Sequence, residues 1–280
     1  MVEDKSEQFD EIGYWSEIKL EILKQYAPAY TKIMSKQNFL KGFYYIDGFA
    51  GYGIHRSKTR SEFILGSPIN ALQVEPPFTW YYFIDLDSER VEHLQALSEE
   101  RNNVTIFNGD CNTVLLEKIF PEIKYENYKR AVCLLDPYRL NLDWKIIACA
   151  GQSKAIEIFL NFPVMDMNRN VLWRNPEKVN SSQIEKMNLF WGNDSWRNVA
   201  YKKSQGLFDV IEEKNSNEDI AEAFRERLRK EAGFDYVADP MPMRNTKGAI
   251  VYYLFFASPN PTGHKIVQDI MTKYRDKGIV

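Results

Sequence analysis

Five apolar segments in the first part of the chain each end in an acidic or amide residue, and this recurrence restricts the fold most. The end residues are Asp47, Asp85, Asp110, Asp136 and Asn161, separated by 38, 25, 26 and 25 residues. Segments with helical spacing of apolar residues lie between them. A strand, a helix and a further strand in this rhythm are typical of βαβ units, whose right-handed crossovers make a sheet parallel. The pattern predicts an α/β fold with these five residues at one edge of the sheet.

The regular pattern stops after residue 163, and the remainder predicts a different organisation. Residues 165–245 are polar and rich in helix-forming residues, so we expect a mainly helical insertion there. Residues 248–258 read GAIVYYLFFAS, which is typical of a strand, and a final helix follows a turn. The long first step predicts an extra loop at about residues 54–66. We interpret residues 1–280 as a single domain that carries this insertion.

Composition excludes several classes of protein. The 280 residues are 44% hydrophobic, as in a folded globular protein, and 36 Lys and Arg against 39 Asp and Glu give a net charge of −3. This balance argues against a protein that coats nucleic acid but allows an enzyme with one basic cleft. The scattered Cys and His residues predict neither a disulfide framework nor a metal site, and they fit a reducing cytoplasm. No segment resembles a signal peptide or a membrane span, so we expect a cytoplasmic protein without membrane contact.

A glycine-rich loop, Asp47-Gly-Phe-Ala-Gly-Tyr-Gly53, directly follows the first strand. Gly48, Gly51 and Gly53 allow a tight turn and a close approach to a ligand, and the segment also contains Phe49 and Ala50. Its spacing is G-x-x-G-x-G and the next helix begins late, so it does not suit the pyrophosphate of a dinucleotide. S-adenosylmethionine has no phosphate and fits this loop better.

The three strand-end acids can be matched to the three parts of S-adenosylmethionine. Asp47 would meet the ammonium group, Asp85 the ribose hydroxyls, and Asp110 the exocyclic amine of adenine. Leu86 and Cys111 would flank the adenine ring. Each acid taken singly also fits a turn or a helix cap, but three in succession beside a glycine loop favour a binding site.

The fourth strand ends in Asp136-Pro137-Tyr138, beside the proposed cofactor. An amine nucleophile could donate to Asp136 and to the carbonyl of Pro137, while Tyr138 stacks on a base. A simple strand-to-turn transition is the alternative.

The segment after the fifth strand predicts contacts with a substrate. Asn161, Phe162 and Pro163 would line the acceptor, and Arg169 and Arg174 would contact phosphate or base. A helix-capping loop is the alternative interpretation.

These segments together resemble the three-Cys-motif partner protein family (TcmP) of class I S-adenosylmethionine-dependent methyltransferases. The resemblance covers nearly the whole chain and includes Phe83-Ile-Asp-Leu-Asp87, Asn108-Gly-Asp110 and Phe190-Trp-Gly192. It implies a Rossmann-like core: a mostly parallel seven-stranded sheet with helices on both faces and an antiparallel C-terminal hairpin. It also implies a partner protein, encoded nearby, that carries the cysteine motif. Adenine-N6 methyltransferases are similar in having Asp-Pro-Pro-Tyr where this chain has Asp-Pro-Tyr.

The sequence therefore predicts methyl transfer from S-adenosylmethionine to a nitrogen acceptor in DNA or RNA. The alternative is a methyltransferase-like regulatory protein that binds the cofactor or a partner without transferring a methyl group. A nicotinamide-dependent oxidoreductase is a third hypothesis, which the missing G-x-G-x-x-G motif disfavours.

Overall fold

A central sheet of eight strands organises the computed structural model, which describes residues 10–58, 62–205 and 210–275. The strand order is β11-β13-β8-β7-β2-β5-β6, and β12 also pairs with β13. The strands are β2 (Gly42–Asp47), β5 (Trp80–Asp85), β6 (Val104–Asn108), β7 (Lys129–Leu135), β8 (Ile156–Phe162), β11 (Tyr236–Val237), β12 (Met241–Arg244) and β13 (Ile250–Ser258).

The predicted mostly parallel α/β sheet is confirmed. Strands β2, β5, β6, β7 and β8 are parallel, and β13 runs antiparallel to β8, β11 and β12. The count of eight strands, against the seven expected, arises because β11 and β12 pair with different parts of β13. The turn between β12 and β13 makes the antiparallel hairpin that the sequence indicated near the C-terminus.

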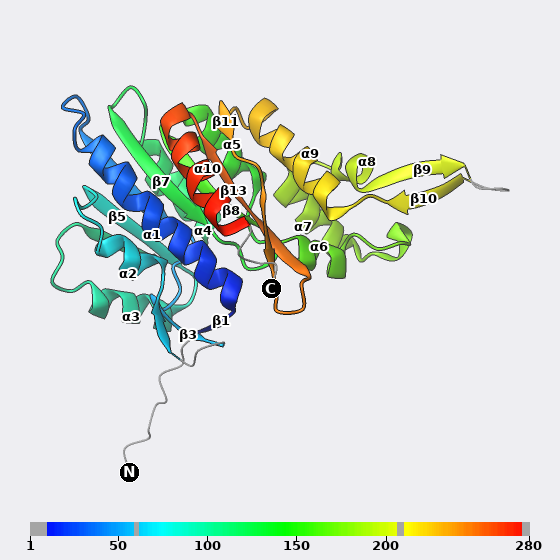
Figure 1. The fold of residues 1–280 in the computed structure, drawn as a ribbon, viewed down its shortest axis with the longest axis horizontal. Coiled ribbons are helices and arrows are strands. Elements are labelled where there is room, and N and C mark those ends of the chain that lie inside the picture. The colour runs from blue at the N-terminus through cyan, green and yellow to red at the C-terminus, as the bar shows by residue number, and fades with distance from the viewer. Residues whose placement is uncertain (1–9, 59–61, 206–209, 276–280) are drawn as a thin grey trace, which may run out of the picture.

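Helices cover both faces of this sheet, as Figure 1 shows. Buried residues of α1, α2, α3 and α10 form one core with the sheet, and those of α4, α5, α7, α8 and α9 form the other. The helices are α1 (Tyr14–Met34), α2 (Ser67–Leu72), α3 (Ser88–Leu97), α4 (Cys111–Val114), α5 (Trp144–Ser153), α6 (Val164–Asn170), α7 (Ser181–Trp191), α8 (Trp196–Ala200), α9 (Asn217–Lys230) and α10 (Pro261–Arg275). Short helical turns are η1 (Leu115–Ile119), η2 (Phe120–Glu122) and η3 (Pro176–Lys178).

Alternation along the strands decides which side chains face α1. In β7, Val132 and Leu134 belong to the core under α1, whereas Cys133 and Leu135 belong to the core on the other face. Successive side chains of a strand point to opposite faces. The same alternation brings Asp47, at the end of β2, and Asn161, in β8, to the α1 face.

Residues 165–245, where a mainly helical insertion is expected, contain most of α6, then α7, α8 and α9, and also a hairpin of β9 (Tyr201–Gln205) and β10 (Val210–Lys214). The same range includes β11 and β12, which belong to the central sheet. Figure 1 shows this hairpin projecting from the body of the molecule. Helix α9 instead packs on the sheet, because its Ala221, Phe224 and Leu228 lie in the core. Part of the segment therefore completes the sheet's hydrophobic core.

The predicted loop at residues 54–66 contains β3 (Ile54–Ser57) and β4 (Phe63–Leu65), and β3 pairs with β1 (Asp10–Ile12) as well as with β4. This small sheet lies beside the N-terminal end of α1 (Figure 1). Among the described residues, no helix has the length and apolar character needed to cross a bilayer.

Candidate functional site at the carboxyl edge of the sheet

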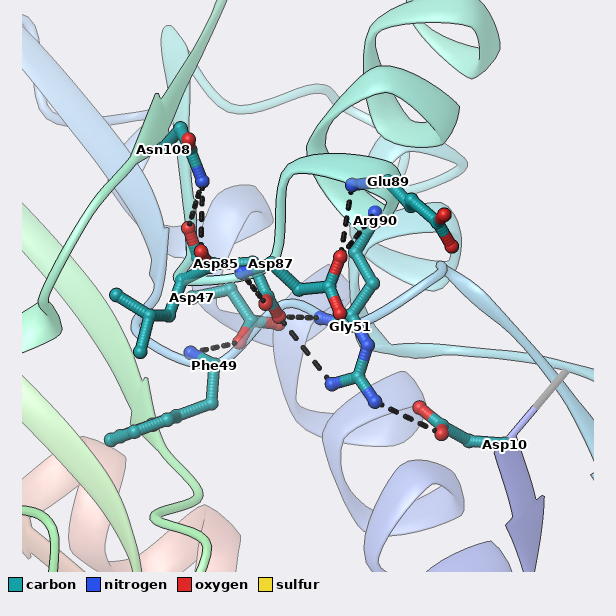
Figure 2. Close-up of polar contacts among 10 residues, drawn as sticks. Asp10, Asp47, Phe49, Gly51, Asp85, Asp87, Glu89, Arg90 and Asn108 are labelled. Carbon is teal, nitrogen blue, oxygen red and sulfur yellow. Dashed lines mark hydrogen bonds and ion pairs between the residues drawn. The ribbon is translucent and has the colours of Figure 1, made fainter. Parts of the chain in front are cut away.

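The glycine-rich loop folds back over the end of β5. The amide of Ala50 donates to the Ile84 carbonyl at 2.9 Å, and the amide of Gly51 donates to Asp85 Oδ2 at 2.8 Å (Figure 2). Gly51 and Gly53 have φ angles of +65° and +74°, a region in which a side chain is strained. The sequence therefore needs glycine at these positions to bring the loop against the strand-end carboxylates.

Asp47 lies at the centre of the site and has no exposed surface. Its carboxylate accepts hydrogen bonds from the Phe49 amide at 3.3 Å and from the Tyr45 hydroxyl at 3.4 Å. Burial raises its pKa to about 6, although hydrogen bonds from Ser67 and Phe49 act in the opposite direction. A cationic ligand group beside Asp47 would relieve this cost of burying a charge.

Asp85 is also buried, and its carboxylate organises the loop around it. Besides Gly51, it accepts a hydrogen bond from the Asp87 amide at 2.9 Å, and its Oδ2 lies 3.8 Å from Arg90 of α3 (Figure 2). Asn108 donates to the carbonyls of Asp85 and Leu86 and so fixes the strand end beside β6. The Oδ1 atom keeps one acceptor position for a ligand hydroxyl.

The predicted adenine contacts have mixed outcomes. Leu86 is 75% exposed and available to a ring, and Phe49 is half-buried. Asp110 is exposed and caps α4 by accepting from the Thr113 amide at 3.0 Å, so the alternative role of a helix cap is present. Cys111 does not fit its predicted role, because its side chain is buried in the core.

The position of Cys111 follows from the packing of Gly48. A Cβ atom at Gly48 would lie 2.8 Å from Cys111 Sγ, so the thiol fills the space that the missing side chain leaves. Burial raises the pKa of this thiol well above its usual range. Cys111 therefore supports the loop from below, and only its backbone could approach a ligand.

Asp136 follows β7 and is the acid around which a second group of predicted residues meets. Its Oδ1 accepts a hydrogen bond from Asn161 Nδ2 at 2.6 Å, and its Oδ2 forms an ion pair with Lys19 of α1. Pro137 is buried, whereas Tyr138 is 75% exposed, with the guanidinium of Arg139 lying 5.5 Å from its ring centre. Tyr138 is thus free to stack on a planar group.

A pocket of about 450 Å³ opens next to Asn161, the hydrogen-bond partner of Asp136, between the end of β8, α6, α7 and β13; Asp136 itself is not among the described residues that line it. Four of the predicted residues line it: Tyr138, Asn161, Pro163 and Arg169. Cations that the sequence reasoning did not select, Arg139 and Lys186, line it as well. The pocket therefore combines one exposed aromatic ring with three positive charges and one negative charge, that of Asp166, on which all three cations act.

Two predicted substrate residues lie elsewhere. Phe162 has no exposed surface, and its ring packs against those of Phe190, Phe224 and Phe255, so its predicted contact with a substrate is wrong. Alternation along β8 explains this, because Asn161 faces the site and the next side chain must face the opposite core. Arg174 is exposed and is not among the described residues that line the pocket.

Three residues that sequence reasoning missed complete the site. Lys19, 7% exposed, reaches Asp136 from α1, and Arg90 links Asp85 to Asp10, which lies 3.1 Å from its guanidinium. His55 of β3 has a buried Nδ1 without a hydrogen-bond partner among the described residues. One feature of the sequence could have identified Lys19: it lies four residues after the buried Trp15 and therefore on the core-facing side of α1.

This donor set fits a molecule with the parts of S-adenosylmethionine. Asp47 offers an anion for an ammonium group, and Lys19 and the unpartnered His55 offer polar groups for a carboxylate. Asp85 offers an acceptor for hydroxyls, and Leu86 offers an apolar surface.

No family model and no curated protein matches this sequence. Among solved structures, a Legionella pneumophila protein of the DUF519 family superposes with a TM-score of 0.53 at 14% identity, over 95% of this chain and 94% of its own. A candidate methyltransferase from Thermobifida fusca gives a TM-score of 0.43 at 11% identity, over 87% of this chain and 81% of its own. The CurJ carbon methyltransferase gives 0.41 at 12%, over 86% of this chain and 55% of its own. The Legionella similarity, which spans both chains, shows that this chain has the same overall α/β fold.

Proposed function

We propose that this chain is an S-adenosylmethionine-dependent methyltransferase that acts on a nitrogen atom in nucleic acid. The observation that carries the proposal is the meeting of Asp47, Asp85 and the glycine loop at one edge of a parallel sheet, next to Asp136 and the mainly basic pocket that its partner Asn161 lines. Ligands of open α/β sheets bind at this edge. The structural neighbours named as methyltransferases agree with this choice, and the resemblance to the three-Cys-motif partner family supports it.

The residues of the cofactor side would act mainly by binding and orientation. Asp47 would hold the ammonium group, Asp85 the ribose hydroxyls and Asp110 the adenine amine. The bound cofactor supplies a sulfonium methyl group, and transfer forms a carbon–nitrogen bond, breaks a carbon–sulfur bond and releases one proton from the acceptor. Direct displacement of this kind depends on holding the two reacting atoms in line.

The acceptor side would orient the attacking nitrogen. Asp136 would accept a hydrogen bond from the amine and the carbonyl of Pro137 a second one, which points the nitrogen lone pair at the methyl group. Tyr138 would stack on the base. Arg139, Arg169 and Lys186 would contact the phosphates, because an exposed ring among cations is how proteins bind single-stranded nucleic acid.

A tritiated-methyl transfer assay tests this function. Purified protein is incubated with labelled S-adenosylmethionine and single-stranded DNA or RNA, and label in the nucleic acid is counted. Wild-type protein should transfer label, and Asp136→Ala should lose most of it while still binding S-adenosylhomocysteine. Transfer that survives in Asp136→Ala would contradict the role of Asp136, and failure to bind the cofactor at all would refute the proposal.

A second candidate function is a methyltransferase-like regulatory protein that binds the cofactor without transferring the methyl group. One observation favours it: both oxygens of Asp136 already have partners, Asn161 and Lys19. Cofactor binding without transfer to DNA, RNA or protein would support this candidate over the enzyme. On the basis of the family resemblance, we also propose a partner protein that is encoded nearby and carries a three-cysteine motif. Copurification of the two proteins from a co-expressing strain would test this interaction.

A further inference from the structure

Lys19 is a buried cation at a position where a helix normally places an apolar residue. It lies on the core-facing side of α1 with its side chain 8% exposed, and its ammonium contacts the carboxylate of Asp136. Burying a lysine without a partner is costly, so the partner determines where the ammonium lies. Burial acts to lower the pKa of Lys19 and is the largest single effect, but the combined interactions with Asp136, Tyr252 and Asp47 outweigh it and the pKa is raised.

The surroundings of Lys19 contain more negative than positive charge. Asp47 and Asp136 both act on this single ammonium, and Asp136 in turn raises the pKa of Asp47. His55 does not supply a second cation, because burial and the nearby Lys19 both lower its pKa. One cation between two carboxylates suits a zwitterionic ligand, whose ammonium satisfies one carboxylate and whose own carboxylate takes the cation.

The same arrangement leaves Asp136 fully engaged in the free protein. Asn161 donates to one carboxylate oxygen and Lys19 pairs with the other. An acceptor amine would have to compete with a charged donor, and hydrogen bonds between charged groups are about twice as strong as neutral ones. The proposed acceptor site is therefore weakened as long as Lys19 stays on Asp136.

We propose that Lys19 exchanges partners when the cofactor binds. Its ammonium moves from Asp136 to the carboxylate of the methionine part, and Asp136 becomes free to bind the acceptor nitrogen. This inference rests on the proposed function, because it takes S-adenosylmethionine as the ligand. It makes Lys19 a positioning residue that couples the two halves of the site. His55, whose Nδ1 has no partner among the described residues, interacts electrostatically with Lys19 and Asp136 and would be a second polar group for the carboxylate of the methionine part.

Two ligands separate this exchange from simple structural support. S-adenosylhomocysteine carries the carboxylate, whereas 5′-methylthioadenosine keeps the nucleoside and lacks the amino acid part. Each is titrated by calorimetry into wild type, Lys19→Met and Asp136→Asn. Lys19→Met should lower the affinity for S-adenosylhomocysteine about tenfold or more, as expected when a hydrogen bond to a charged group is lost. The affinity for 5′-methylthioadenosine should stay unchanged.

The decisive variant is Asp136→Asn, because the exchange predicts that it binds S-adenosylhomocysteine more tightly than wild type. Removing the charge of Asp136 removes the group that competes for Lys19. In the Lys19→Met background the same substitution should have no effect on either ligand. Lys24→Met, an exposed lysine on the same helix, is the matched control and should bind both ligands as wild type does.

The outcomes distinguish this inference from the function on which it rests. If Asp136→Asn binds S-adenosylhomocysteine no more tightly, or changes both ligands equally, the exchange is refuted although the cofactor site stands. If wild type binds neither ligand, the proposed function itself is refuted. Asp136→Asn is nearly isosteric and lies at a partly exposed position, so it decides the question even if Lys19→Met does not fold.

Discussion

Replacing Asp85 by alanine should destabilise the glycine loop and weaken cofactor binding at the same time. The carboxylate accepts hydrogen bonds from the amides of Gly51 and Asp87 at 2.8 and 2.9 Å and lies near Arg90. Hydrogen bonds to a charged group contribute about 1.5–3 kcal/mol each, so losing two should lower the free energy of unfolding by at least about 3 kcal/mol. Losing the contact with the ribose hydroxyls should lower the affinity for S-adenosylhomocysteine about tenfold or more.

Urea unfolding and calorimetric titration measure these two effects separately. Asp85→Asn keeps one acceptor oxygen, so it should lose less stability than Asp85→Ala. Asp87→Ala is the matched control, because Asp87 is exposed and caps α3 by accepting from the amides of Glu89 and Arg90. The Asp87→Ala variant should lose about 1 kcal/mol of unfolding free energy and keep the wild-type affinity for S-adenosylhomocysteine. A folded Asp85→Ala protein with wild-type affinity would remove Asp85 from the binding site.

Three further predictions concern the loop, the core and the pocket. Gly53→Ala should cost about 1–2 kcal/mol in urea unfolding, because φ is +74° and the new Cβ atom would lie 3.2 Å from two side chains; an unchanged stability would contradict this. Burial raises the pKa of Glu157 from 4.5 to about 7, so the folded state binds a proton more tightly than the unfolded state does. The free energy of unfolding should therefore fall as the pH rises from about 4.5 to about 7. Glu157→Gln should flatten that slope, leaving the comparable contribution of Asp47, whose pKa is raised from 3.8 to about 6. An identical pH profile would refute the assignment. Arg169→Glu should weaken binding of a labelled oligonucleotide in an anisotropy titration, whereas Arg174→Glu should have a much smaller effect; equal effects would argue against the pocket.

The arrangement of the strand ends could be predicted from sequence because of a simple geometric constraint. Strands in a parallel sheet have their carboxyl ends at the same edge, so Asp47, Asp85 and Asp136 had to lie near one another once the strands were identified. The glycine loop was identifiable for a similar reason, since Gly51 and Gly53 adopt angles that other residues avoid.

The contacts of individual side chains could not be predicted in the same way. Lys19 and Asp136 are 117 residues apart, and their ion pair depends on how α1 packs on the sheet. Phe162 faces the core because Asn161 faces the site. Every residue of β8 is buried, on both faces of the strand, so the sequence alone did not show which face meets the site. The capping role of Asp110 follows from the local turn, which suits a helix cap as well as it suits a ligand.

Binding of labelled S-adenosylmethionine to the intact chain, measured by equilibrium dialysis, tests the central claim most directly. We predict that each chain binds a single molecule, that S-adenosylhomocysteine displaces it, and that a nicotinamide dinucleotide does not. The same measurement on Asp85→Ala should show weaker binding. Absence of binding to the wild-type protein, or displacement by the dinucleotide, would contradict the assignment of the carboxyl edge as a methyltransferase cofactor site.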